Sequence, residues 1–197
     1  TWACDWMLGD EILNKVGGIW VNDEMDKGNS WVWDSWISWL SAADIKTDGD
    51  TGKGLWSNAW YAIRKANLGL ENLENLTDAT PEQRDIIKGQ LLFFRGFYHF
   101  ELMTYWGGMP YIDKAFSSAD KLEYPRLNCH QTAERIAQDL REAADLLPAD
   151  WDKTATGKLT LGKNQLRVSK ITALGYLGKN YLYAGSPLLN YESTGNK

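Results

Sequence analysis

Apolar residues recur at the spacing of one helix face through most of the chain. The first such stretch spans 2–16 and stops at Gly17-Gly18, as helices often do at glycine. A second helix is expected after a cap at Asn29-Ser30. Its apolar face is made of Trp33, Trp36, Ile37 and Leu40. The segment 44–54 is polar and rich in Gly, Asp and Lys, which predicts a loop.

A long helix is predicted to begin at Thr80, because Thr80 and Gln83 have the spacing of a capping box and Pro81 suits the first helical position. The helix should end at Gly107-Gly108. Its apolar stripe is expected to consist of Ile87, Leu91, Phe94, Tyr98, Leu102 and Tyr105, widened by Ile86, Phe93, Phe97 and Phe100. Gly89 and Gly96 would let a neighbouring helix approach closely.

Three further helices are predicted, at about 55–76, 128–147 and 169–184. The first has a stripe made of Ala59, Ile63, Ala66, Leu70 and Leu73. The second has a stripe made of Ala133, Ile136, Leu140, Ala143 and Leu147. An irregular stretch, 109–127, and a polar connector, 149–166, separate the later helices.

Apolar and polar residues do not alternate for long enough anywhere to predict a strand, so the fold class is all-α. Long helices joined by short turns indicate stacked antiparallel hairpins, a TPR-like superhelix. We expect two regions. Residues 1–54 would form an N-terminal helical extension with a Trp-rich segment and a polar loop, and 55–197 a TPR-like helical domain.

The net charge is -5, and the basic residues form no run or stripe. Nucleic-acid binding needs clustered Lys and Arg, so a nucleic-acid partner is not expected. No stretch approaches the roughly 18 apolar residues that a membrane-spanning helix needs. The two cysteines, Cys4 and Cys129, lie too far apart for metal-ligand spacing, and both a disulfide and two free thiols remain open.

Four stretches, in order, resemble the SusD/RagB family. Residues 56–67 resemble its first long helix, with a Tyr-x-x-Ile-x-x-Ala-Asn core. Residues 89–110, GQLLFFRGFYHFELMTYWGGMP, are similar to its aromatic helix and Phe/Tyr-Gly-Gly-x-Pro turn, with Phe for Leu and Gly for Ala at Phe94 and Gly96. Residues 133–144 resemble an Ile-x-x-Asp-Leu-x-x-Ala helix, and 170–190 end in a similar Ser-Pro-Leu-x-Asn loop.

The resemblance implies a lipid-anchored protein on the surface of the outer membrane of Bacteroidota-like bacteria. Such proteins sit as a lid on a TonB-dependent SusC-like transporter and capture glycans, or sometimes peptides. Full-length members are much longer, so we expect this chain to be an N-terminal portion without its signal peptide and lipid anchor. A helical docking module without its own ligand, and a peptide-binding member, are the alternatives.

The tryptophans are the best candidates for glycan contacts, because the apolar face of a sugar ring stacks on an indole. The chain has 11 of them, and the ligand-binding candidates are Trp31, Trp33, Trp36 and Trp39. The alternative is that these rings pack into the core. Asp48 and Asp50 could hydrogen-bond sugar hydroxyls; they only faintly resemble a calcium loop, since no Glu stands at the required distance.

No catalytic residue, metal site or cofactor is predicted. Asp23, Glu24 and Asp26 sit together in a polar connector, whereas glycoside hydrolysis needs carboxyl groups on either side of a sugar. His99 is expected to be a hydrogen-bonded core group, and Arg95 to belong to a structural hydrogen-bond network. The sequence therefore predicts a glycan-binding protein and not an enzyme.

Overall fold

The computed structural model describes residues 55–121 and 123–187, and all of the regular structure in these ranges is helical. The helices are α2 (Leu55–Glu71), α3 (Pro81–Trp106), α4 (Cys129–Leu146), α5 (Ala155–Lys158) and α6 (Lys170–Ala184), with short 3-10 turns at Leu73–Asn75 and Trp151–Lys153. The predicted all-α fold is confirmed for these residues. Across the described helices, none combines the length and apolarity needed to cross a bilayer.

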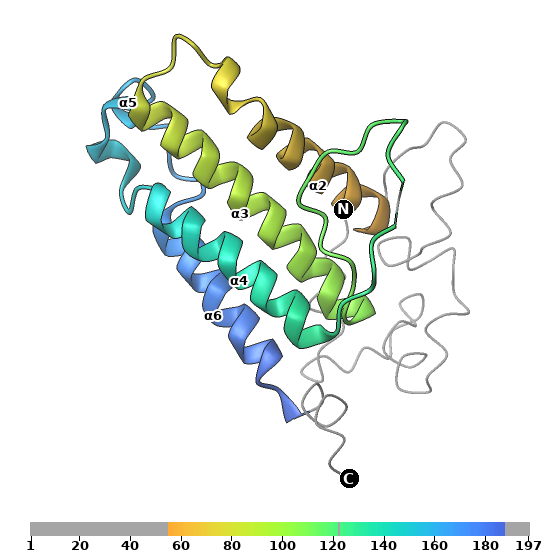
Figure 1. Ribbon diagram of the computed structural model, residues 1–197. Helices are drawn as coiled ribbons and strands as arrows, with labels where there is room; N and C mark the ends of the chain where they lie inside the picture. Colours follow the sequence, from red (N-terminus) through yellow and green to blue (C-terminus); the bar gives the residue numbers. More distant parts are fainter. Residues whose placement is uncertain (1–54, 122, 188–197) are drawn as a thin grey trace, which may run out of the picture. The chain divides into compact units, whose positions relative to one another are not determined.

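Helices α3, α4 and α6 lie side by side, each antiparallel to the next, and α2 runs antiparallel to α3 (Figure 1). The predicted stacking of antiparallel hairpins is therefore confirmed. Helix α4 is the centre of this layer, since it packs against both α3 and α6. Its predicted stripe forms the core, with Ile136, Leu140 and Ala143 fully buried.

Capping residues set the start of three helices where the sequence predicted them. Thr80 accepts a hydrogen bond from the backbone N–H of Gln83, and the Gln83 side chain accepts one from the Thr80 N–H. Asn128 makes the same reciprocal pair with Gln131 at the start of α4. Ser169 does so with Thr172 at the start of α6. These pairs satisfy N–H groups that a helix start otherwise leaves unpaired.

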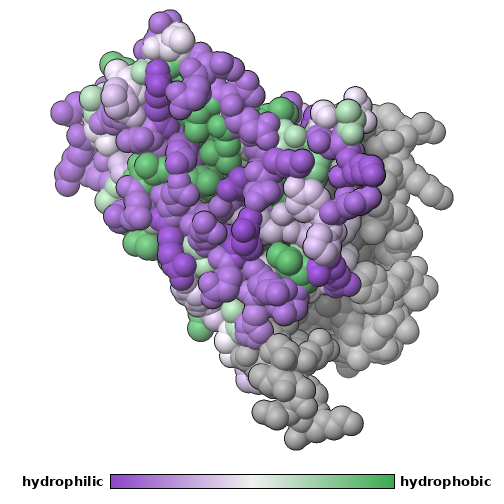
Figure 2. All heavy atoms as spheres, in the orientation of Figure 1, coloured by the Kyte–Doolittle hydropathy of each residue, from purple (hydrophilic) through white to green (hydrophobic). Residues whose placement is uncertain are grey.

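Helix α3 buries a different face from the one predicted. Phe94, expected on the main stripe, is 39% exposed, and Ile87 and Leu91 are only half-buried. Figure 2 shows the resulting apolar surface over the N-terminal half of this helix. The buried face consists of Ile86, Gly89, Leu92, Phe93, Gly96, His99, Phe100, Leu102 and Met103. Leu102 of the predicted stripe is buried, and so are Ile86, Phe93 and Phe100, which were expected to widen it. The rest of the main stripe was wrong because apolar residues surround α3, so periodicity alone could not select the face.

The two glycines of α3 decide which face α4 covers. A Cβ at Gly89 would lie 2.9 Å from Leu147 Cγ, and one at Gly96 would lie 3.3 Å from Leu140 Cγ. Each glycine thus receives a leucine of α4 or its C-cap, and the predicted close approach at these positions is confirmed.

Two connectors differ from their predictions in detail. Helix α2 ends at Glu71 and is followed by a separate 3-10 turn, whereas one helix was expected up to 76. The segment expected to be a polar connector contains α5 and the buried Trp151, whose Nε1–H donates to the Val168 carbonyl over 2.9 Å. Cys129 is a free thiol at the start of α4, and Cys4 lies outside the described residues.

Candidate functional site

The glycan-contact residues predicted from the sequence all lie outside the described residues. They are Trp31, Trp33, Trp36, Trp39, Asp48 and Asp50. The division into an extension, 1–54, and a helical domain, 55–197, likewise stays a prediction. The described part of the chain shows how the irregular segment 107–128 is held and which side chains that segment brings together.

Two glycines let the chain turn at the end of α3 and let the backbone at Gly108 lie close to the backbone at Leu127. Gly107 ends α3 with a φ of +74°, a conformation that L side chains rarely adopt. A Cβ at Gly108 would lie 2.3 Å from the Leu127 carbonyl oxygen, so only glycine fits there. Arg126 holds the turn at Gly107 from both sides, because its Nε donates to the Gly108 carbonyl over 2.6 Å and its Nη2 donates to the Trp106 carbonyl over 2.8 Å.

A buried ion pair fastens this segment to three helices. Arg95 of α3 makes a bidentate pair with Asp139 of α4, with Nε–Oδ2 at 2.6 Å and Nη2–Oδ1 at 2.7 Å. Arg95 Nη1 also donates to Asn67 Oδ1 of α2 and to the Asp113 carbonyl. Asn67 in turn donates to the carbonyls of Ile112 and Lys114. The predicted structural network around Arg95 is confirmed.

The electrostatics of this network keep the Arg95 guanidinium charged and the Tyr111 hydroxyl protonated. Burial alone would lower the pKa of Arg95, but the hydrogen bonds and the charge of Asp139 raise it. Burial, reinforced by the charge of Asp139, raises the pKa of Tyr111 well above its usual value. The Tyr111 hydroxyl therefore stays protonated and donates to Asp139 Oδ2 over 2.5 Å.

His99 is fully buried and held as one neutral tautomer. Its Nδ1 lies 2.8 Å from the Arg95 carbonyl, which can only accept, so Nδ1 carries the proton. Its Nε2 accepts from the Ile112 N–H over 3.1 Å. Burial, together with the charges of Arg95 and Arg135, lowers the pKa of His99 to about 3, although the hydrogen bond to the Arg95 carbonyl acts in the opposite direction. The prediction that His99 is a hydrogen-bonded core group is confirmed.

An aromatic hollow forms where the fastened segment meets α2. Its volume is about 170 Å³, and it is lined by Trp60, Ile63, Arg64, Ile112, Lys114 and Phe116. Arg64 Nη1 donates to the Phe116 carbonyl over 2.5 Å, and the Trp60 ring meets the His99 ring edge-on at 5.9 Å. The walls are thus two aromatic rings and two cationic side chains set on a rigid support.

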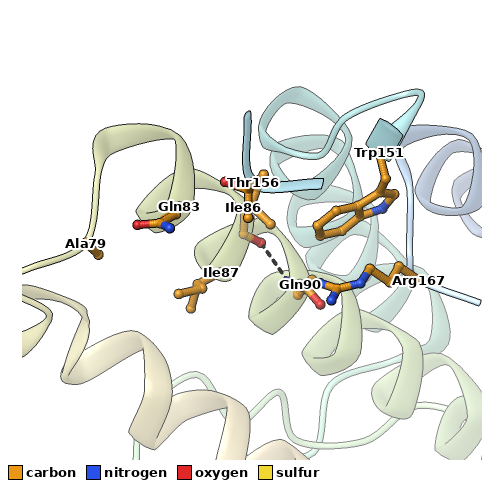
Figure 3. Close-up of a pocket in the computed structure, with 8 residues that line it drawn as sticks. All are labelled: Ala79, Gln83, Ile86, Ile87, Gln90, Trp151, Thr156 and Arg167. Atoms are coloured by element: carbon orange, nitrogen blue, oxygen red, sulfur yellow. Dashed lines mark hydrogen bonds between the residues drawn. The ribbon is translucent and has the colours of Figure 1, made fainter. Parts of the chain in front are cut away.

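A second hollow of about 270 Å³ lies at the N-terminal end of α3 (Figure 3). Its side chains include Gln83, Gln90 and Ile87 of α3, together with Trp151 and Arg167. The Arg167 guanidinium lies 4.8 Å from the centre of the Trp151 ring, and Trp151 is only 4% exposed. This indole is therefore already covered and does not offer a stacking face.

Little in the sequence predicts the aromatic hollow. Trp60 follows Ala59 of the predicted stripe and belongs to the stretch that resembles the family's first long helix. Phe116 lies in the irregular stretch, where no periodicity marks it. Only the folded path of 107–128 brings the two together. Among residues 55–121 and 123–187, no three His, Cys, Asp or Glu side chains are grouped so that they could hold a metal ion.

Known proteins share both the sequence and the helical layer. SusD-like protein P2 from Formosa agariphila is 28% identical over 131 residues, which are 66% of this chain and 24% of the relative. Surface glycan-binding protein A from Bacteroides uniformis is 25% identical, with a TM-score of 0.56 over 66% of this chain and 27% of that one. A SusD-like protein from Bacteroides fragilis, 24% identical, shares the fold, with a TM-score of 0.58 over 66% of this chain and 23% of its own.

The chain spans about a quarter of the length of these relatives. A family model for SusD-like proteins, described as starch-binding and associating with the outer membrane, matches residues 17–182. This match takes in well over half of the 197 residues, including the whole of α2, α3 and α4 and most of α6, so the chain belongs to the SusD-like family.

Proposed function

We propose that this chain is the helical part of a cell-surface protein that binds glycans and delivers them to a SusC-like TonB-dependent transporter. The family match over residues 17–182, to proteins described as starch-binding, carries the proposal. A relative named surface glycan-binding protein A supports it. Binding without bond cleavage suffices for this role. The protein would stand on the outer membrane through a lipid anchor.

The network around Arg95 supports a role as a rigid frame. A binding site is more effective when its side chains are held in place before the ligand arrives, because less conformational entropy is lost on binding. The bonds from Arg95 and Asn67 fix the backbone from Ile112 to Lys114, and Arg64 fixes it at Phe116. The aromatic hollow is therefore ordered before any ligand is present.

We propose two sets of glycan contacts. The first set is the one predicted from the sequence, made of Trp31, Trp33, Trp36, Trp39, Asp48 and Asp50. The second is the pair Trp60 and Phe116 in the aromatic hollow. Aromatic contacts are worth about 0.5–1.5 kcal/mol each beyond area burial, so several together would give useful binding.

Isothermal titration of the longer polypeptide that contains this chain tests the proposal, with α-1,4- and β-1,3-linked glucan oligosaccharides and plant and host glycans as ligands. We expect one glycan class to bind, and we expect Trp33→Ala and Trp60→Ala to weaken it, by about tenfold for each 1.4 kcal/mol lost. Tyr61→Ala is the matched control, since Tyr61 is 62% exposed and lies outside the hollow. Failure to bind any glycan would count against the proposal.

A docking module without its own ligand is the second candidate, favoured by the exposed apolar residues of α6. A peptide-binding member of the same family is the third. Titration with peptide mixtures and co-purification with the SusC-like transporter distinguish these three candidate functions. If tryptophan substitutions at 31, 33 and 36 lower the melting temperature but leave the ligand affinity of the folded protein unchanged, those rings belong to the core and the docking role gains support.

A further inference from the structure

The chain between α5 and α6 turns leucines toward solvent instead of burying them. We call residues 158–167 the leucine loop, since Leu159 is 78% exposed, Leu161 62% and Leu166 100%. The loop lies beside α5, at the end of the helical layer where α3 begins (Figure 1). Three leucines held in water on one short loop indicate a surface that meets an apolar phase or partner.

A buried asparagine holds the leucine loop in one conformation. Asn164 is only 7% exposed, and its Nδ2 donates to Asp152 Oδ1 over 2.6 Å and to the Gly157 carbonyl over 2.9 Å. Its Oδ1 accepts from the Thr160 hydroxyl over 2.8 Å. The backbone in the middle of the loop is therefore tied to the fold while the leucines on both sides of it stay in water. Their exposure is a property of a fixed conformation.

The leucine loop is also cationic. It contains Lys158, Lys163 and Arg167 but no Asp or Glu, although the whole chain has a net charge of -5. Within the described ranges, none of these three side chains forms an ion pair with a carboxylate. The loop thus combines exposed apolar side chains with cations that have no carboxylate counterion in this part of the chain.

Two carboxylates at the base of the loop are already hydrogen-bonded within the fold. Glu82 of α3 accepts from the N–H and the hydroxyl of Thr156 over 2.8 and 2.7 Å. Asp152 accepts from the side chain of Asn164. These acids fix the position of the loop, and the loop cations stay available to an anionic partner.

We propose that the leucine loop inserts into the surface of an anionic lipid layer. The leucines would enter the apolar region just below the headgroups, and the three cations would lie level with the lipid phosphates. A second copy of the loop would oppose like charges, and a purely apolar groove would bury the cations without partners. Insertion would also set how the helical layer stands on a membrane. This contact goes beyond the lipid anchor of the proposed function and needs no glycan.

Sedimentation of the 197-residue chain with lipid vesicles tests the proposal. We expect the chain to bind vesicles of phosphatidylglycerol mixed with phosphatidylcholine and to bind pure phosphatidylcholine more weakly. Binding to the mixed vesicles should fall as the ionic strength rises. Lys158→Gln/Lys163→Gln should weaken it by about fivefold for each lysine at low ionic strength.

The double variant Leu159→Ser/Leu166→Ser tests the apolar part of the contact. It should lower binding to the mixed vesicles by at least about tenfold, because both leucines would no longer gain from leaving water. Leu182→Ser is the matched control, since Leu182 is 77% exposed on α6, and it should leave vesicle binding unchanged. All of these variants should keep the parent melting temperature, because the substituted side chains are exposed.

The proposal is overturned if the chain does not bind the mixed vesicles, or if Leu182→Ser weakens binding as much as the loop variants do. A loss that follows the lysines alone would also overturn it, because the leucines would then remain in water. The longer polypeptide, made without its lipid anchor, should bind the same vesicles. If it fails to bind while this chain binds, another part of that polypeptide covers the loop and the proposal is wrong. None of these readouts depends on glycan binding, so this inference and the proposed function can fail independently.

Discussion

Helices α4 and α6 pack alike on their inner faces and differ on their outer ones. Both turn small and apolar side chains toward the core, such as Ala143 of α4 and Ala173 of α6. The exposed positions of α4 are Gln131, Glu134, Arg135, Gln138, Arg141 and Asp145, a surface suited to water. Those of α6 are mainly leucine, isoleucine, tyrosine and glycine. The difference is that α4 turns a polar face outward, whereas α6 turns an apolar one outward among the described residues.

The largest loss of stability should come from removing the Asp139 carboxylate on the inner face of α4. Asp139→Ala would leave Arg95 charged and buried, and the Tyr111 hydroxyl without its acceptor. Removing one partner of a buried ion pair typically costs roughly 3–5 kcal/mol. We expect a loss of this size in the free energy of unfolding by urea. Asp145→Ala, on the exposed face of the same helix, should change it by less than about 0.5 kcal/mol.

A matched pair of leucines compares the two helices directly. Leu140→Ala on α4 should cost roughly 2–5 kcal/mol, because Leu140 is fully buried against Gly96. Leu182→Ala on α6 should be close to neutral in this chain, since Leu182 is 77% exposed. Urea unfolding of both variants checks the contrast. A large loss from Leu182→Ala in the chain alone would show that the outer face of α6 is already covered.

Acid should lower the free energy of unfolding, because His99 is buried in its neutral form between α3 and its neighbours. An unfolded histidine has a pKa of about 6.5, whereas His99 in the folded chain has one of about 3. Below about pH 6.5 the unfolded state therefore binds a proton that the folded state does not. The contribution of His99 to stability is complete above that value and should fall by about 1.4 kcal/mol per pH unit on the way down to about 3.

Urea unfolding at several pH values between about 7.5 and 4 measures this slope. His99→Gln is the informative variant, because glutamine does not titrate and can still donate or accept one hydrogen bond. We expect it to lower stability at neutral pH and to flatten the dependence on acid. An unchanged slope in the variant would assign the acid sensitivity to other groups.

The smallest expected effect concerns a feature that the two helices share. Asn128 and Ser169 each cap a helix through a reciprocal pair with the residue three positions later. Asn128→Ala and Ser169→Ala should each cost about 1 kcal/mol. Unfolding free energies of the two variants should therefore agree closely. A much larger loss for one of them would indicate that its helix start does more than satisfy backbone N–H groups.

The helices and their starts could be predicted from the sequence because local chemistry specifies them. The capping box at Thr80 and Gln83, and the amphipathic stripe of α4, act within a few residues of chain. The buried face of α3 could not be predicted in the same way. Apolar side chains surround that helix, and the contact with α4 is decided by where Gly89 and Gly96 let leucines enter.

The candidate site depends even more on distant contacts. Trp60 and Phe116 line the same hollow because Arg95, Asn67 and Arg64 hold the segment between α3 and α4. Neither the spacing nor the type of those residues in the sequence predicts that arrangement. The tryptophans at 31, 33, 36 and 39, which composition alone singles out, remain predictions because they lie outside the described residues.

The reciprocal caps have a consequence for how such proteins can diversify. Each of these helices is capped by residues at its own start, so the connecting stretches do not have to determine where the helix begins. The stretch 72–79 can therefore lengthen, shorten or change chemistry while the helices stay in place, whereas the buried Asn164 ties 159–168 to Asp152 and Gly157. The stretch 107–116 has less of this freedom, because Arg95 holds it. Sequence changes in a connecting stretch such as 72–79 can therefore accumulate without disturbing the packed helices.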